Sequence, residues 1–250
     1  MKEPEYERMF RLEDSYWWFV GRHRLIEAVL RSRYGAPGAQ NASSPLTFLD
    51  VGCGTGAMSV RLTQWGRVVS ADFSSLALQF SRRRGLEHLV GADAMTLPFA
   101  AERFDAVVTM DVLEHLPDDC AAMAEFFRVL KPGGRVFATV PAYAHLWSEH
   151  DVALMHFRRY QLAEMRQRFE SAGFRIEKLS HTMTALYPIV ALQRRLNARK
   201  PPHDPPQAAM PIVPGPINTV LTGFLGAENA LARRFDFPFG LSILCVAVKP

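Results

Sequence analysis

A short apolar run that leads into three alternating glycines constrains this chain more than any other feature. Residues 47–51 read Thr-Phe-Leu-Asp-Val, and Gly52, Gly54 and Gly56 follow at every second position. Only residues without a Cβ atom let the backbone turn this sharply and also come close to a ligand. The stretch therefore predicts a buried strand that leads into a loop able to bind a nucleotide-like cofactor.

Apolar strands alternate with helical patterns after this loop. Such alternation is typical of an α/β protein with a doubly wound, parallel sheet. The final apolar run is expected to form a central strand, because almost every residue in it is apolar. The predicted strands are 46–51, 67–71, 88–92, 104–110, 134–140, 174–180 and 241–248, and the predicted helices between them are 56–65, 74–84, 118–130 and 160–172.

Two segments lie outside this regular alternation. Helical apolar spacing after a run of aromatic residues predicts that residues 1–34 form an N-terminal helical cap. Residues 46–250 are expected to form the main domain, with an insertion at about 182–239. Seven prolines in residues 201–216 are too many for regular structure, so the insertion is expected to be a helical, proline-rich lid.

Charge and cysteine usage narrow the range of functions. The chain of 250 residues carries a net charge of +4 and scattered arginines, which favours anionic molecules or a membrane surface over nucleic acid. Cys53, Cys120 and Cys245 are far apart and lack metal-binding spacing, so neither a disulfide nor a metal site is predicted. A cytoplasmic location is expected, since no secretion signal and no long apolar span is recognisable.

Acidic residues end the strands that follow the glycine loop, and they fall where a cofactor would need them. An acid about 20 residues after such a loop accepts hydrogen bonds from ribose hydroxyls. The motifs, in order, are Asp50-Val51-Gly52-Cys53-Gly54-Thr55-Gly56, Asp72, Asp93, Met110-Asp111-Val112-Leu113-Glu114-His115 and Leu130-Lys131-Pro132-Gly133-Gly134. With these motifs the sequence closely resembles the class I S-adenosylmethionine-dependent methyltransferases.

The resemblance implies a Rossmann-like sheet of seven strands with the last strand antiparallel. It implies S-adenosyl-L-methionine as the cofactor and S-adenosyl-L-homocysteine as its product. Asp72 would bind the ribose diol, because a carboxylate accepts two hydrogen bonds, and Asp93 with the Ala94 backbone would bind adenine. The cofactor-binding residues expected on this basis are Asp50, Gly52, Cys53, Gly54, Gly56, Asp72, Phe73, Asp93, Ala94, Met110 and Asp111.

The resemblance does not fix the acceptor site. Methyl transfer mainly needs proximity and orientation, plus a base where the acceptor must lose a proton. The methyl group would point toward the loops after the fourth and fifth strands, although residues there could equally be structural. The catalytic candidates are His115, His150, Asp151 and His156, and the substrate-binding candidates are Trp17, Trp18, Arg22, Tyr143, Trp147, Arg158 and Tyr160.

We therefore expect a methyltransferase that acts on a small-molecule or lipid-like acceptor, most readily at oxygen. Methylation at carbon or nitrogen of a natural-product or quinone-type substrate is the first alternative. A non-catalytic, cofactor-binding module at a membrane surface is an alternative of another class. A nicotinamide-dependent oxidoreductase is disfavoured, because dinucleotide-binding loops place the third glycine three residues after the second. The oligomeric state stays open.

Overall fold

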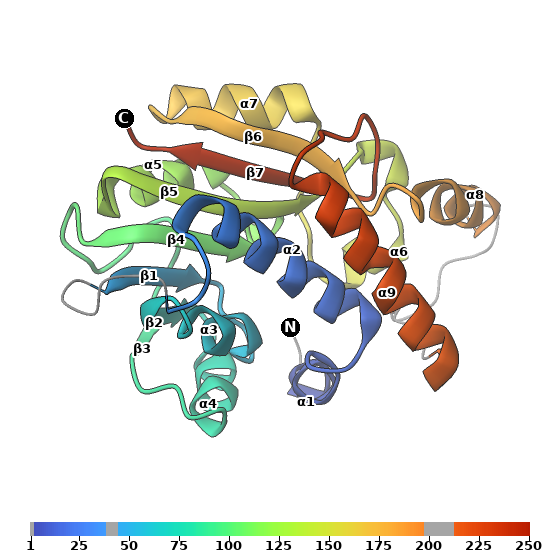
Figure 1. Cartoon of the computed structure of the whole chain (residues 1–250), viewed down its shortest axis with the longest axis horizontal. Coiled ribbons are helices and arrows are strands. Elements are labelled where there is room, and N and C mark those ends of the chain that lie inside the picture. Colours follow the sequence, from blue (N-terminus) through green and yellow to red (C-terminus); the bar gives the residue numbers. More distant parts are fainter. Residues whose placement is uncertain (1–2, 39–44, 198–212) are drawn as a thin grey trace.

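The computed structural model describes residues 3–38, 45–197 and 213–250, and a single mixed sheet runs through its centre (Figure 1). The strands are β1 Leu46–Val51, β2 Gly66–Asp72, β3 Leu89–Gly91, β4 Phe104–Met110, β5 Leu130–Pro141, β6 Arg175–Thr182 and β7 Ser242–Val248. Their order is β3-β2-β1-β4-β5-β7-β6. The first five pair in parallel, whereas β7 is antiparallel to both of its neighbours. The predicted seven-stranded sheet with an antiparallel last strand is confirmed.

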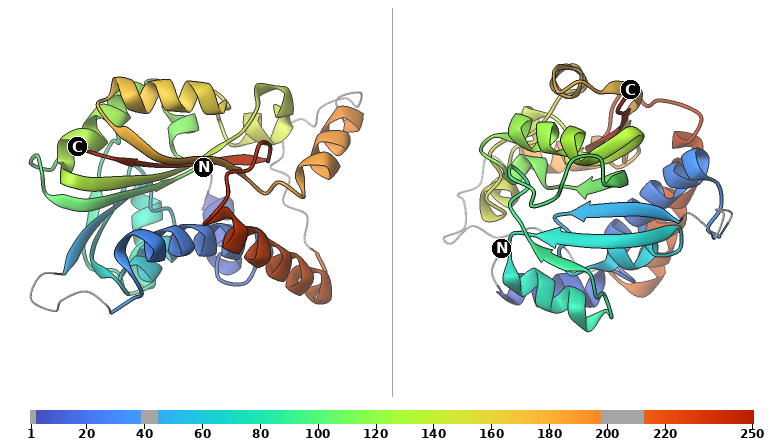
Figure 2. Two further views of the ribbon diagram at one scale, coloured as in Figure 1. Left: turned by 45° about the horizontal axis from the view of Figure 1, so that its top comes forward. Right: turned by 90° about the vertical axis from the view of Figure 1, so that its left-hand side faces the viewer.

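Helices cover both faces of the sheet, because successive residues of each buried strand point to opposite sides. Phe48 of β1 packs on the side of α2, α3 and α9, and Leu49 packs on the side of α5 and α7. The two helical layers are separated clearly in Figure 2. The helices are α1 Glu3–Leu12, α2 Trp17–Tyr34, α3 Ala57–Leu62, α4 Ser75–Arg83, α5 Asp119–Val129, α6 Glu149–Ala153, α7 Leu162–Ser171, α8 Tyr187–Asn197 and α9 Gly215–Ala232, with 3₁₀ turns at Leu113–His115 and Ala144–Leu146.

The N-terminal segment, predicted to be a helical cap, forms two helices, α1 and α2. α1 packs against α4, where the rings of Tyr6 and Phe10 lie against Phe80. α2 starts at Trp17, and its second half belongs to the core, because Ile26 and Leu30 are fully buried against the sheet. Only α1 therefore lies outside the layered core, beside the carboxyl ends of the first strands (Figure 1).

The insertion between β6 and β7 is fastened to the N-terminal segment. α9 runs beside α2, and the amide of Asn229 donates to the Gly21 carbonyl over 2.7 Å. The Asn218 side chain accepts from the Trp17 backbone N–H over 2.8 Å and donates to the Ser15 carbonyl. The predicted proline-rich segment 201–216 lies largely outside the described residues. No helix in the described part of the chain is both long enough and apolar enough to cross a bilayer.

Candidate active site

The glycine loop lies at the carboxyl end of β1, as predicted, and its backbone requires glycine. Gly52, Gly54 and Gly56 have φ angles of 71°, 55° and 88°, which residues with side chains rarely adopt. A Cβ atom on Gly52 would lie 2.2 Å from Cγ2 of Val112, so the loop packs directly against the segment after β4. A Cβ on Gly54 would meet only the flexible end of Met9, at 3.0 Å. Val112 thus packs tightly against one side of the loop, and α1 borders the other side.

Asp72 holds the loop from the end of β2. One of its carboxylate oxygens accepts from the Gly54 N–H over 2.9 Å, and the other accepts from the Ser74 N–H over 2.8 Å. Burial raises the pKa of Asp72, and these two backbone donors oppose the rise. Each oxygen keeps a second lone-pair position for a ligand hydroxyl. The arrangement suits a ribose diol.

Other residues predicted to bind the cofactor lie along the same edge of the sheet. The Phe73 ring is 83% exposed, and Asp93 accepts from the Met95 N–H over 2.9 Å. Asp50 is buried and accepts from the Ser59 hydroxyl over 2.5 Å. Burial raises the pKa of Asp50 to about 7. Ala94 and Cys53 are buried, and burial raises the pKa of the Cys53 thiol well above its usual range.

The end of β4 carries a strained residue. Asp111 has a φ of 54°, unusual for a residue with a side chain, and its N–H donates to the Thr139 carbonyl over 2.9 Å. Its carboxylate pairs with the Arg22 guanidinium and accepts from the Thr139 hydroxyl over 3.2 Å. Such strain persists where the surroundings fix the residue, which is common at functional sites. Arg22, predicted to bind the acceptor, therefore serves as the partner of Asp111, next to Met110.

All four predicted catalytic residues lie in one cluster. The rings of His115 and His156 meet edge to face with centroids 4.6 Å apart, and His150 lies 6.4 Å from His156. Burial lowers the pKa of His115 to about 4, helped by the neighbouring His156. Burial, with Arg194 nearby, likewise lowers the pKa of His150 to about 4. These two imidazoles are therefore neutral near pH 7.

Asp151 is the buried anchor of this cluster. It accepts from Nδ1 of His156 over 2.9 Å and from Nε of Arg159 over 2.7 Å, and Arg194 lies 3.5 Å away. Burial alone would raise the pKa of Asp151, but the His156 hydrogen bond and the Arg159 charge hold it well below its usual range. The Phe157 N–H donates to the Glu114 carbonyl over 2.7 Å, which ties this segment to the turn after β4.

The predicted substrate-binding residues divide into two groups. Tyr143 stacks on His181 with centroids 4.9 Å apart, and Trp17 and Trp18 pack in the same apolar cluster as Tyr143. Trp147 is 41% exposed beside them. These residues line the region between α2, α8 and the loop after β5.

Tyr160 pairs with Tyr143 through its backbone, but the side chains of Tyr160 and Arg158 bond to Asp119 of α5, so the structure does not support a substrate-binding role for either. Tyr160 is fully buried, and its hydroxyl donates to Asp119 over 2.6 Å. Arg158 pairs with the same carboxylate over 2.9 Å and donates to the Pro117 carbonyl. Both side chains tie the segment after α6 to α5. Their polar ends are already occupied, and this explains why they are unavailable to a substrate.

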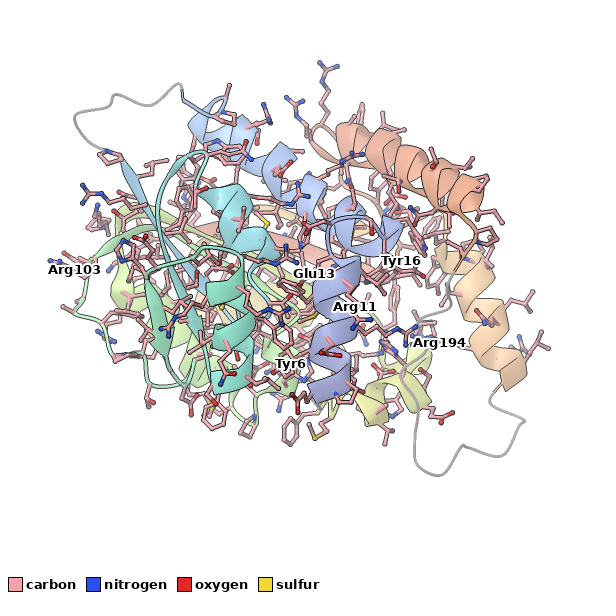
Figure 3. The ribbon with its side chains drawn as sticks, turned by 90° about the horizontal axis from the view of Figure 1, so that it is seen from below. Tyr6, Arg11, Glu13, Tyr16, Arg103 and Arg194 are labelled. Atoms are coloured by element: carbon pink, nitrogen blue, oxygen red, sulfur yellow. The ribbon has the colours of Figure 1, made fainter. Side chains whose placement is uncertain are left out.

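Sequence reasoning missed the contact between α1 and the glycine loop. Glu13, just after α1, is buried and accepts hydrogen bonds from the Thr55 hydroxyl and from Arg84, the latter over 3.1 Å. Burial raises the pKa of Glu13 to about 7. Figure 3 shows Glu13 and Tyr6 at the side of α1 that faces α3 and α4. A single acid in a polar helical segment gives no sequence signal for this role.

Comparison with known proteins agrees with the geometry. The family described as "Methyltransferase domain" matches residues 49–138, which run from the end of β1 into β5. Residues 49–138 are therefore similar to a methyltransferase domain. A "Ubiquinone biosynthesis O-methyltransferase" of Xanthomonas oryzae pv. oryzae is 32% identical over 142 residues, which are 54% of this chain and 59% of that protein. The chain thus spans less than two thirds of that relative.

Two further similarities extend the comparison of the methyltransferase domain. A "Demethylmenaquinone methyltransferase" of Corynebacterium efficiens is 38% identical over 114 residues, which are 43% of this chain and 49% of that protein. An S-adenosylmethionine-dependent methyltransferase of Thermotoga maritima superposes with a TM-score of 0.59 over 99% of this chain and 95% of that one. The identity to this structure is 16%, so it shows the fold alone.

Proposed function

We propose that the protein transfers a methyl group from S-adenosylmethionine to a quinone-type, hydroxyl-bearing small molecule. The observation that carries the proposal is the alignment of three features at one edge of the sheet: the glycine loop after β1, Asp72 after β2 and the strained Asp111 after β4. The histidine cluster follows directly after β4 and β5. The two named relatives act in ubiquinone and demethylmenaquinone chemistry, which supports a quinone-type acceptor.

The described residues fit S-adenosylmethionine. A Cβ on Gly54 would be hindered only by the end of Met9, so the loop has room for a ligand at this position. Asp72 would hold the ribose hydroxyls, and Asp111 would flank the positively charged sulfonium end. The bound cofactor supplies an activated methyl group, so the chain has only to hold and orient both partners.

An oxygen acceptor must be ionised before it can attack the methyl group. The proposed acceptors of that proton are the neutral imidazoles of His115 and His150 and the Asp151–His156 pair, which lie together in one cluster. The aromatic rings of Trp17, Trp18 and Tyr143 would pack against the acceptor ring. Oxygen is therefore the proposed site of methylation, and carbon or nitrogen methylation is the alternative.

The test uses the full chain with S-adenosylmethionine carrying a ¹³C-labelled methyl group. Calorimetry should show binding of S-adenosylhomocysteine, and NMR of the products should show an O-methyl resonance with a catechol that bears a short isoprenoid chain. A C-methyl or N-methyl resonance would instead support the alternative acceptor atom. Cofactor binding without product from catechol, demethylmenaquinone or amine acceptors would favour a non-catalytic module, and absence of binding would refute the proposal.

We also propose that the insertion touches a membrane surface in a reducing, cytoplasmic compartment. Ile189 and Leu192 of α8 are 64% and 59% exposed, and Val220 of α9 is 70% exposed. Exposed arginines 233 and 234 follow α9, which suits anionic headgroups. All three cysteines are unpaired, in keeping with a reducing compartment.

Flotation with vesicles containing phosphatidylglycerol tests the membrane contact. Val220→Asp should reduce the bound fraction several-fold, whereas Val60→Asp on α3 should leave it unchanged. Equal flotation of both variants would contradict the contact.

A further inference from the structure

Glu114, His115 and His156 bring three metal-ligating side chains together from two segments of the chain. A carboxylate oxygen and one ring nitrogen from each histidine all lie within 4.8 Å of one another. Glu114 and His115 come from the turn after β4, and His156 comes from the segment after α6. The spacing of the cysteines predicts no metal site, and only the fold brings His156 to the adjacent Glu114 and His115.

The Glu114 carboxylate has no ordinary structural explanation. Its side chain is fully buried, and neither oxygen has a hydrogen-bond partner of normal geometry. A buried carboxylate without a partner is costly, and such groups in native proteins call for an ion, a water or a chemical role. The nearby charges are Asp111, Arg22 and Arg159, and neither arginine forms an ion pair with Glu114. A cation beside Glu114 would satisfy it.

Asp151 prepares His156 for the role of a ligand. Because Asp151 binds Nδ1 of His156 over 2.9 Å, Nε2 is the nitrogen left to face the cluster. Asp151 is itself fixed by the Ser148 backbone N–H over 2.9 Å and by Arg159. A carboxylate that binds the second nitrogen of an imidazole is the usual outer partner of a metal-bound histidine. The ring orientation is therefore already set.

We propose that Glu114, His115 and His156 bind a divalent transition metal ion. Two imidazoles and one carboxylate suit Zn²⁺, Mn²⁺ or Fe²⁺, and they leave coordination positions open for an acceptor. Binding itself does not depend on the proposed methyl transfer. The catalytic use of the ion does rest on that function, because the ion would lower the pKa of a coordinated acceptor hydroxyl.

The chemical step balances with this ion present. With the ion bound, His115 and His156 would serve as ligands, so the hydroxyl would release its proton to solvent instead of to these imidazoles. The oxygen then forms a bond to the methyl carbon. The bond between that carbon and sulfur breaks, and its electron pair stays on sulfur to give S-adenosylhomocysteine. No oxidant or reductant takes part, and the ion keeps its charge throughout.

Metal analysis of the untagged full chain tests the site directly. After treatment with EDTA and dialysis against Zn²⁺ or Mn²⁺, mass spectrometry should find one equivalent of metal per chain. His156→Ala should weaken binding at least tenfold, and Glu114→Gln should do the same while keeping the side-chain size. His88→Ala, an exposed histidine outside the cluster, should bind as the wild type does.

Cobalt supplies a second measurement, which reports on the ligands of the bound ion, and circular dichroism shows whether each variant is folded. Co²⁺ added to the wild type should give a visible d–d absorption band, which His156→Ala should lose and His88→Ala should keep. A wild type without stoichiometric metal, or equal binding by His156→Ala, would overturn the inference. Methyl transfer that continues after complete metal removal would refute only the catalytic use, whereas metal binding without any transfer would refute the proposed function.

Discussion

Glu13 offers a prediction whose size follows from the structure. Its carboxylate is buried between α1 and the glycine loop, where the Thr55 hydroxyl and Arg84 contact it. Burial raises its pKa from 4.5 to about 7. One pKa unit corresponds to about 1.36 kcal/mol. The difference of 7 − 4.5 = 2.5 therefore sets an upper limit of about 3 kcal/mol on the contribution of Glu13 to the free energy of unfolding.

The sign follows from the raised pKa. Between 4.5 and about 7 the folded protein binds the Glu13 proton more tightly than the unfolded chain does. Folding stability from this group is therefore greatest below about pH 4.5 and falls as the pH rises toward 7. Above that range the full cost of a buried, charged carboxylate is present. Glu13→Gln removes the titrating group and with it this part of the pH dependence.

Urea unfolding of the wild type and Glu13→Gln between about pH 5 and about pH 8 measures the effect. The free energy of unfolding of the wild type should fall relative to the variant by up to about 3 kcal/mol across this range. Asp14→Asn is the matched control, because Asp14 is an exposed partner of the same Arg84. Parallel pH profiles for the wild type and Glu13→Gln would show that Glu13 is solvated and would refute the docking of α1 by this residue.

Three further variants test other parts of the site. Asp72→Asn should weaken S-adenosylhomocysteine binding roughly 10- to 100-fold in calorimetry, because a charge-assisted contact is worth about 1.5–3 kcal/mol; unchanged affinity would mean that Asp72 does not bind the ribose. Gly52→Ala should lower the melting temperature, since its Cβ would lie 2.2 Å from Val112; an unaltered melting curve would contradict the close packing. Tyr160→Phe removes the hydrogen bond to Asp119, so it should lower the free energy of unfolding by about 1–3 kcal/mol and leave KM for the acceptor unchanged. A raised KM would show that Tyr160 contacts the substrate.

The sequence predicts those parts of the site that are local in the chain. The glycine loop and the acids at the strand ends are each specified by a few adjacent residues, because backbone conformation and strand termination are local properties. Asp72 reaches Gly54 because parallel strands bring their carboxyl ends to one edge. The parallel strands follow from the same patterns, whereas the antiparallel β7 is implied by the resemblance to class I methyltransferases.

Residues whose roles depend on distant partners could not be assigned in this way. Tyr160 carries the same side chain whether it lines a pocket or lies in the core, and only the position of Asp119 decides between the two. Arg22 likewise depends on where α2 crosses the end of β4. The pairing of Glu114 with His156 requires two loops to meet, and no periodicity in the sequence reports such a meeting.

The ties between α2 and α9 have a consequence for how an acceptor enters. Asn218 and Asn229 join α9 to both ends of the aromatic segment that begins α2, and Arg22 of the same helix holds Asp111. The helix α2 therefore connects the outer insertion to the end of the site where the methyl donor would bind. A displacement of the insertion, for example on contact with a bilayer, would therefore move α2 and shift the Arg22–Asp111 ion pair without any change in the sheet.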